Sequence, residues 1–296
     1  MKTKNPFEHT GAYWVKYSSY EWKKAPDGQE YLIPAADAEP SVYDALSSPE
    51  QLVLDALNVG LLFFVKAPEE QVKASLLDFA GKYGLLGLMT ALPTTPQFTD
   101  YERVYFPKNP FLREESMDTL AYMKLFFPFR MPDFHKDGVQ SLWNVSGDGR
   151  KLAALAMTFG NDPRAKAMSF MRDYGERYDW LKETFRDWTF TFLSVCLFCK
   201  DSKDLDNDTK ALYRQGLACF EGNAPTYHLE LWDAPVMVWD FHSLLLAIRF
   251  LLSLKLIDAD HPLRMCEHCQ KAFYAERRDS RFCSDACRNA HRKPDK

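Results

Sequence analysis

The sequence of 296 residues has no run of about eighteen uncharged apolar residues, the length that a transmembrane helix needs. Its most apolar stretch, LLLAIRFLLSLKL from Leu244, is interrupted by Arg249 and Lys255, so we expect a buried helix there. The first residues, MKTKNPFEHTGAYW, lack the apolar segment of a secretory signal. We therefore expect a cytoplasmic protein in a reducing compartment, with no membrane partner.

The sequence also lacks the short motifs of nucleotide-binding proteins and hydrolases. It contains no Gly-x-Gly-x-x-Gly, no P-loop and no Gly-x-Ser-x-Gly. Three histidine–carboxylate neighbourhoods lie outside the C-terminal segment, and we interpret them as structural or surface residues: His135 with Asp137, His228 with Glu230, and Asp240 with His242. The sequence predicts no enzyme, although a catalytic site before the C-terminal segment stays an alternative.

Hydrophobic residues make up 46% of the chain and aromatic residues 15%, enough for a large core in one or two domains. We predict a mainly α fold with a few short strands (α+β). In the first fifty residues we expect short strands or irregular structure, with a turn at Asp27-Gly28. Capping residues and periodicity predict helices at Ser48-Pro49 to Gly60, Pro68 to Gly84, 112 to 126, Asn161 towards Lys200, 211 to 220 and about 240 to 257. A loop is expected at 85–99 and a strand from Thr226.

Charge is distributed unevenly along the chain. Between Arg264 and Lys296 there are nine Lys or Arg residues and five acidic ones, a surplus of four positive charges. The whole chain has a formal charge of −4, so the remainder carries −8. We expect two domains: a mainly helical body at 1–260 and a basic C-terminal finger at 261–296, with a partner of its own.

Four of the seven cysteines form two tight pairs in this finger. Cys266-x2-Cys269 is separated by thirteen residues from Cys283-x3-Cys287. In a reducing compartment, such pairs are typical of a zinc site, since two local turns can supply four thiolates to one tetrahedral ion. Four sulfur ligands leave no open position for water, so the predicted Zn²⁺ is structural.

The residues around the cysteines predict a treble clef. The thirteen-residue spacer is long enough for a hairpin, with Phe273, Tyr274 and Phe282 as a minimal core. Ser284 is placed to cap a short helix from Asp285 to Lys293, which carries the last ligand. The expected order is a knuckle, a hairpin and a helix.

Other interpretations of the cysteines stay open. Disulfides or free thiols are the alternative to a metal site, and His268 or His291 could replace a cysteine ligand. Cys196-x2-Cys199 lies in the apolar stretch TFLSVCLFCK, where we expect core packing, as for Cys219.

The finger resembles two known kinds of zinc finger. Phe282-Cys283-Ser284-Asp285-Ala286-Cys287, after a first Cys pair, is similar to the signature of FCS-type fingers. The segment from Phe241 onward also resembles the CGNR finger of certain bacterial stress-induced transcription regulators, although this chain has Cys-Arg-Asn-Ala at 287–290. That resemblance implies DNA binding. Small gyrase-inhibitor zinc proteins share the ligand spacing and bind protein, which implies a protein partner instead.

The favoured hypothesis is a DNA-binding transcriptional regulator whose body senses a signal or dimerises. The alternative is an interaction module whose finger docks on a protein. A single finger buries little surface, so a homodimer or the body would have to add contacts. The candidate phosphate contacts are the basic side chains of the finger: Arg277, Arg278, Arg281, Arg288, Arg292 and Lys293.

Overall fold

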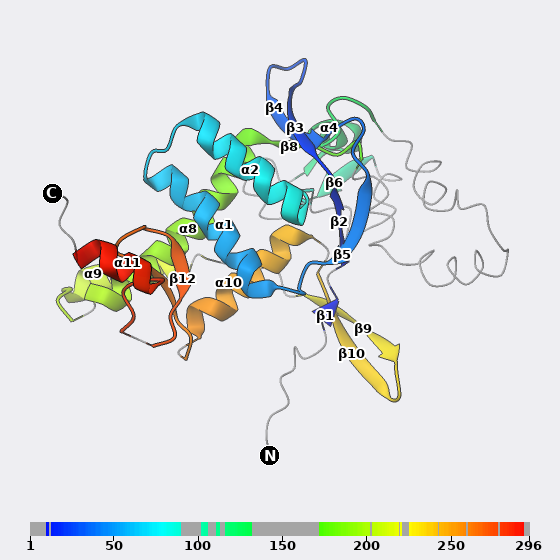
Figure 1. The fold of residues 1–296 in the computed structure, drawn as a ribbon. Coiled ribbons are helices and arrows are strands. Elements are labelled where there is room, and N and C mark those ends of the chain that lie inside the picture. The colour runs from blue at the N-terminus through cyan, green and yellow to red at the C-terminus, as the bar shows by residue number, and fades with distance from the viewer. Residues whose placement is uncertain are drawn as a thin grey trace. The chain divides into compact units, whose positions relative to one another are not determined.

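The computed structural model describes residues 10–11, 13–89, 102–105, 111–112, 116–131, 172–201, 203–218, 220, 225–241, 243–258, 260–277 and 279–292. These residues form seven helices and twelve short strands, an α+β fold as the sequence predicts (Figure 1). The chain divides into two compact units, and the division of residues 1–260 from 261–296 stays a prediction. The first unit comprises Met1–Leu46, Ala80–Leu181 and Pro225–Leu245, and the second comprises Ser47–Phe79, Lys182–Ala224 and Leu246–Lys296.

Short strands make up most of the regular structure in the first unit. Its described residues form four small sheets with strand orders β1-β10-β9, β2-β5, β3-β4-β8 and β6-β7. β1 is parallel to β10, and the other neighbouring pairs are antiparallel. The elements are β1 (Thr10–Gly11), β2 (Tyr13–Tyr17), β3 (Tyr20–Lys24), β4 (Glu30–Pro34), β5 (Pro40–Asp44), β6 (Arg103–Tyr105), β7 (Ser116–Asp118), α4 (Thr119–Lys124), β8 (Glu176–Arg177), β9 (Thr226–Leu231) and β10 (Pro235–Asp240).

Helices dominate the second unit. They are α1 (Pro49–Phe64), α2 (Glu69–Tyr83), α8 (Tyr178–Asp201), α9 (Asn207–Ala218), α10 (Leu244–Ile257) and α11 (Asp285–Arg292), and parts of α2, α8 and α10 are counted with the first unit. The finger adds an antiparallel pair, β11 (Leu263–Met265) and β12 (Ala272–Tyr274). Within the described ranges, no helix combines the length and hydrophobicity needed to cross a membrane.

Several predicted elements are confirmed. The aromatic N-terminal segment forms strands, and the turn between β3 and β4 contains Gly28 with a left-handed φ of 85°. α1 begins at Pro49, because proline fits the first helical position. α2 ends before Gly84, whose φ of 85° terminates the helix without steric cost. The predicted strand from Thr226 is β9, and the predicted apolar helix is α10.

The prediction that Gly60 ends α1 is wrong, because the helix continues to Phe64. Gly60 instead allows α1 and α8 to approach closely. A Cβ atom at this position would lie 2.0 Å from Thr189 Oγ1 and 2.4 Å from the carbonyl oxygen of Phe185. The glycine therefore reflects helix–helix packing, a tertiary requirement that local sequence does not reveal.

Two other predicted helices differ from the structure. Residues 116–118 of the helix expected at 112–126 form β7, and α4 starts after Asp118, whose Oδ1 accepts a hydrogen bond from the Ala121 N–H (2.9 Å). The long helix expected from Asn161 begins at Tyr178 within the described residues, because 176–177 pair with β4. Residues 161–171 and 90–99 lie outside the described part. β10 was not anticipated.

A buried carboxyl group fixes the irregular segment that follows α2. Glu176 is fully buried and accepts hydrogen bonds from the backbone N–H groups of Leu86 (2.9 Å), Gly87 (2.6 Å) and Leu88 (3.1 Å). The hydroxyl of Tyr174 also donates to it (3.1 Å). Burial raises the pKa of Glu176 to about 7, against the opposing effect of these hydrogen bonds. One side chain thus satisfies backbone donors that no helix or strand satisfies.

We expect Gly60→Ala to destabilise the second unit. The new methyl group collides with Thr189 and Phe185, so the loss of packing should outweigh the gain in helix propensity and cost about 1–3 kcal/mol. Thermal or urea unfolding measures the change. Gly81→Ala in α2 is the control, because its Cβ meets nothing within 4 Å, and it should be neutral or stabilising. Equal effects of the two substitutions would contradict the close-packing role.

We expect Glu176→Gln to be less stable than wild type at pH 5 by about 1–3 kcal/mol, because the amide NH₂ faces a backbone donor. Because its pKa is raised, Glu176 contributes most to the free energy of unfolding below pH 4.5, and this contribution falls as the pH rises through about 7. The deficit of the variant should therefore narrow between pH 5 and 8, as urea titrations would show. Glu21→Gln, at an exposed position of β3, is the control. A constant deficit would mean that Glu176 is ionised throughout this range.

Candidate metal centre

The first cysteine pair occupies the turn between β11 and β12. Cys266 directly follows β11, and its N–H donates to the carbonyl oxygen of Lys271 (2.9 Å). The N–H of Gln270 donates back to the carbonyl oxygen of Cys266 (2.9 Å), and Gln270 adopts a left-handed φ of 58°. This tight turn places Cys269 beside Cys266. The hairpin therefore surrounds the first pair, and the expectation of a hairpin within the spacer is wrong.

The second cysteine pair lies at the start of α11. Cys283 precedes the helix, and Cys287 is in its first turn. Ser284 caps the helix as predicted, since its Oγ accepts a hydrogen bond from the N–H of Cys287 (3.2 Å). The cap therefore orients the residue that carries the fourth sulfur.

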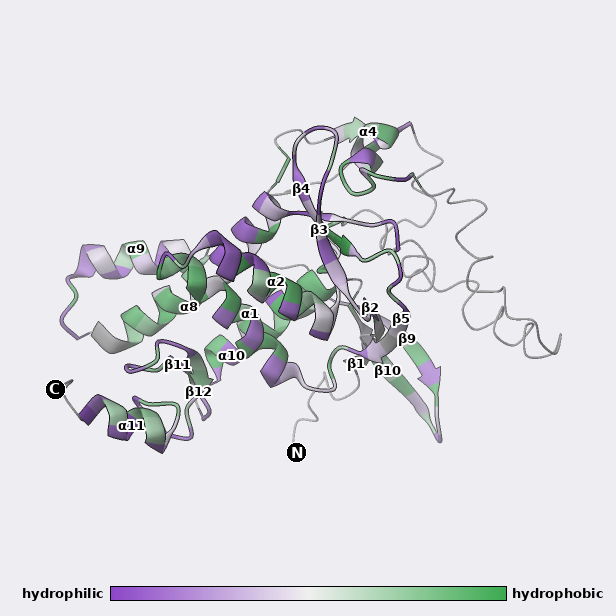
Figure 2. Cartoon of the chain, turned by 45° about the horizontal axis from the view of Figure 1, so that its top comes forward, coloured by the Kyte–Doolittle hydropathy of each residue, from purple (hydrophilic) through white to green (hydrophobic). Residues whose placement is uncertain are grey.

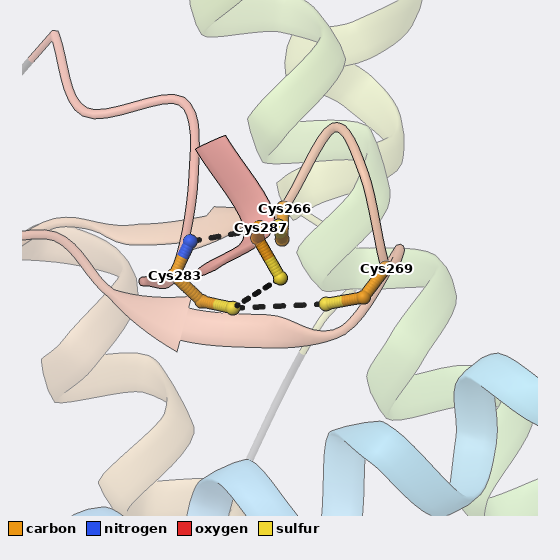
Figure 3. A group of neighbouring side chains, drawn as sticks. All are labelled: Cys266, Cys269, Cys283 and Cys287. Atoms are coloured by element: carbon orange, nitrogen blue, oxygen red, sulfur yellow. Dashed lines mark hydrogen bonds between the residues drawn. The ribbon is translucent and has the colours of Figure 1, made fainter. Parts of the chain in front are cut away.

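The four sulfur atoms converge, all within 4.8 Å of one another. The Sγ of Cys283 lies 3.7 Å from that of Cys269 and 3.5 Å from that of Cys287 (Figure 3). Tetrahedral metal–sulfur bonds of about 2.3 Å require sulfur–sulfur distances of about 3.8 Å. The cluster can therefore hold one metal ion with little movement of the backbone.

The thiols differ in their affinity for protons. Burial acts to raise the pKa of Cys266, but the backbone N–H groups of Cys269, Cys283 and His268 outweigh it and lower the pKa to about 6. Burial and the three neighbouring thiols raise the pKa of Cys283 to about 12, and burial raises that of Cys269. A metal ion binds thiolates, so its entry would displace protons, and its affinity should fall as the pH falls.

A small core surrounds the sulfur cluster. Cys266, Phe273 and Ala275 are buried together, and Phe282 packs against them. Two of the three predicted core residues are therefore in place. Tyr274 instead donates its hydroxyl to the carbonyl oxygen of Glu50 in α1 (3.3 Å).

The hairpin is attached to α1 within the second unit. The N–H of Ala272 donates to Oδ1 of Asn58 (2.9 Å), and Lys255 of α10 bonds Glu50 (2.7 Å) while lying over the ring of Tyr274. Sequence reasoning missed the contacts with α1, because no local pattern links residues more than 200 positions apart. The finger therefore packs on helices of its own unit rather than projecting as a separate tail.

The two histidines of the finger do not belong to the sulfur cluster. The rings of His268 and His291 lie nearly perpendicular, with centroids 6.4 Å apart, and His291 also packs against Phe282. Among the described residues, the only group that can share an ion consists of the four cysteines. The interpretation with four sulfur ligands therefore fits better than one with a histidine.

The candidate nucleic-acid contacts fall into three groups. Arg281 forms a two-pronged ion pair with Glu267, and Arg288 pairs with Asp285 at 3.0 Å. Arg277 and Arg292 are exposed, and neither forms an ion pair with another residue of the described ranges. The remaining two, Arg278 and Lys293, lie outside the described residues.

The other candidate residues do not form a second site in the described part of the chain. Cys196 is partly buried and its Sγ lies 3.7 Å from the carbonyl oxygen of Leu263, and burial raises its pKa to about 12. Cys199 is exposed, so the expected core packing is wrong for this residue. Glu230 accepts a hydrogen bond from the indole of Trp232 (2.8 Å). Outside the described part are Cys219, His135, Asp137 and His242, and the side chains of His228 and Asp240.

The comparisons with known proteins found no matching family model, curated protein or solved structure. The resemblance to FCS-type and CGNR fingers therefore rests on the cysteines and their neighbours alone. The convergence of the four sulfurs is consistent with a zinc finger.

We expect Cys266→Ser to abolish metal binding, because it removes the buried sulfur of the cluster. Elemental analysis of the purified protein should give about one metal ion per wild-type chain and almost none for the variant. Cys199→Ser, at an exposed cysteine of α8, is the matched control and should keep the ion. Retention of metal by Cys266→Ser would exclude the four-sulfur site.

Proposed function

We propose that the four cysteines bind Zn²⁺ and that the protein is a DNA-binding transcriptional regulator. Four sulfurs at tetrahedral distances favour zinc, since thiolates select zinc over hard cations such as Mg²⁺ and Ca²⁺. A shell of four protein ligands leaves no position for water or substrate. The ion is therefore structural, and its contribution is to fold the finger.

The exposed surface of the finger supports nucleic-acid binding. Within its described residues, Met265 is the only large apolar side chain that is exposed, whereas α11 contains no buried residue and carries Arg288 and Arg292. A surface that is basic and nearly free of apolar side chains suits phosphate contacts. This observation carries the proposal.

The six basic residues differ in how much of their charge is free to contact phosphate. Arg281 and Arg288 are each engaged by an acidic neighbour, which reduces the charge that they offer to phosphate. Arg277 and Arg292 are therefore the principal contacts, with Arg278 and Lys293 assigned from the sequence alone. A zinc ion with four thiolates carries −2, which halves the finger's surplus of four positive charges.

Docking of the finger on a protein is the alternative. It requires an exposed apolar patch, and Met265 alone is too small to supply one. In the DNA-binding regulator, the body would sense a signal, add DNA contacts or dimerise.

We expect binding to random duplex DNA to weaken with rising salt, with a slope of about −0.9 per phosphate contacted. Arg277→Ala/Arg292→Ala should weaken binding and reduce the steepness of that slope by about two. Fluorescence anisotropy of a labelled duplex measures both quantities. The control is Arg186→Ala/Arg214→Ala, which removes the same charge from exposed positions of α8 and α9 and should preserve the slope. A flat salt dependence, or equal effects of the two variants, would argue against DNA binding by the finger.

A further inference from the structure

β9 and β10 form a two-stranded arm at residues 226–240 of the first unit, extending past β1 (Figure 1). The strands pair over six consecutive residues, from Thr226 opposite Asp240 to Leu231 opposite Pro235, without an interruption. Leu229 lies opposite Met237. Because side chains alternate along a strand, three alternate pairs share one face of the arm: Tyr227 with Trp239, Leu229 with Met237 and Leu231 with Pro235.

This face is apolar and exposed. The exposed fraction is 60% for Tyr227, 69% for Leu229, 80% for Leu231 and 43% for Met237. Hydrophobic colour is visible on both strands of the arm in Figure 2. Side chains of such size offer roughly 200 Å² each when fully exposed, so the four present on the order of 500 Å². Contiguous apolar patches of about this size on a protein surface are often functional.

The edge of the arm lacks the usual protection against pairing. Among the residues that the structure describes, β9 is the outermost strand of its sheet, so one row of its backbone N–H and C=O groups faces away from β10. Exposed edge strands commonly contain Lys, Pro or a bulge, which prevent another strand from pairing with them. β9 (TYHLEL) has no Lys or Pro, and its pairing with β10 is regular along its whole length.

We propose that the arm binds a second copy of this chain, with the two β9 strands paired antiparallel about a two-fold axis at Leu229. This register places Leu229 opposite Leu229 and Tyr227 opposite Leu231, which extends the apolar face across both arms. It also places His228 opposite Glu230, whereas a shift of one position to either side places one of these residues opposite itself. Cross-strand pairs of complementary character stabilise a sheet, and like charges directly opposite each other destabilise it.

The mode of pairing supports an interface between two copies. Joined edge to edge, the two β9 strands exchange main-chain hydrogen bonds, which supply the affinity when a strand is added to an exposed sheet edge, and the joined apolar face lies on one side of the resulting sheet. In a dimer with a two-fold axis, the same surface of each copy contacts the other, so one self-complementary strand edge is enough to form the interface. The pairing does not involve the metal centre, so it stands or falls independently of the proposed zinc and DNA binding.

The test is the oligomeric state of full-length protein from about 1 to about 100 μM by sedimentation equilibrium. Wild type should associate to a dimer in this range. Leu229→Lys/Leu231→Lys should weaken association at least about tenfold, because it places charge in the joined apolar face and on the edge strand. Leu212→Lys is the matched control, since Leu212 of α9 has the same exposed fraction as Leu229, 69%, and it should dimerise as wild type does.

Hydrogen exchange tests the strand pairing. Backbone amides of 226–231 should exchange more slowly at high than at low protein concentration in wild type, and equally at both in the double variant. Circular dichroism and metal content should be unchanged in the variant, which shows that it is folded. A monomeric wild type, a double variant that dimerises normally, or a dimer without added protection of 226–231 would each overturn the proposal.

Discussion

The convergence of four sulfur atoms determines the structure of the finger. The buried cluster around the sulfurs has three residues, Cys266, Phe273 and Ala275, which is too little apolar surface to hold a chain of this length folded by itself. The turn of the first cysteine pair and the cap of α11 both serve to aim sulfurs at a common point. With the proposed ion in place, metal–ligand bonds supply the free energy that a core would otherwise supply, an apparent ~10–16 kcal/mol in zinc-finger peptides.

Glu176 has the corresponding role in the first unit. One carboxyl group accepts hydrogen bonds from three successive backbone N–H groups and from Tyr174. In both units, therefore, irregular backbone is organised around a central polar group. The two centres differ in chemistry, because the sulfur cluster could bind and release a metal ion whereas the carboxyl group is permanently attached and can only gain or lose a proton.

The sequence predicted those features that depend on neighbouring residues. The cysteine spacing, the cap at Ser284, the proline at the start of α1 and the glycine after α2 each act within one turn of chain, so each could be located. Gly60 was misinterpreted because its small size serves α8, which is distant in sequence. The prediction placed the hairpin between the two cysteine pairs. The cysteine spacing indicates a turn at each pair but does not show which strands flank it. The partners of Glu176 lie about 90 residues away, and no local pattern identifies them.

The attachment of the finger to α1 has a consequence for synthesis of the chain. Asn58 and Ala272 are separated by 214 residues, so the acceptor on α1 is made long before its donor on β12. At ribosomal rates of about 5–20 residues per second, the interval is on the order of 10–40 s. During that time, Asn58 faces water or another part of the nascent chain. Final assembly of the helical unit is therefore a late event, completed only when the C-terminal hairpin has emerged.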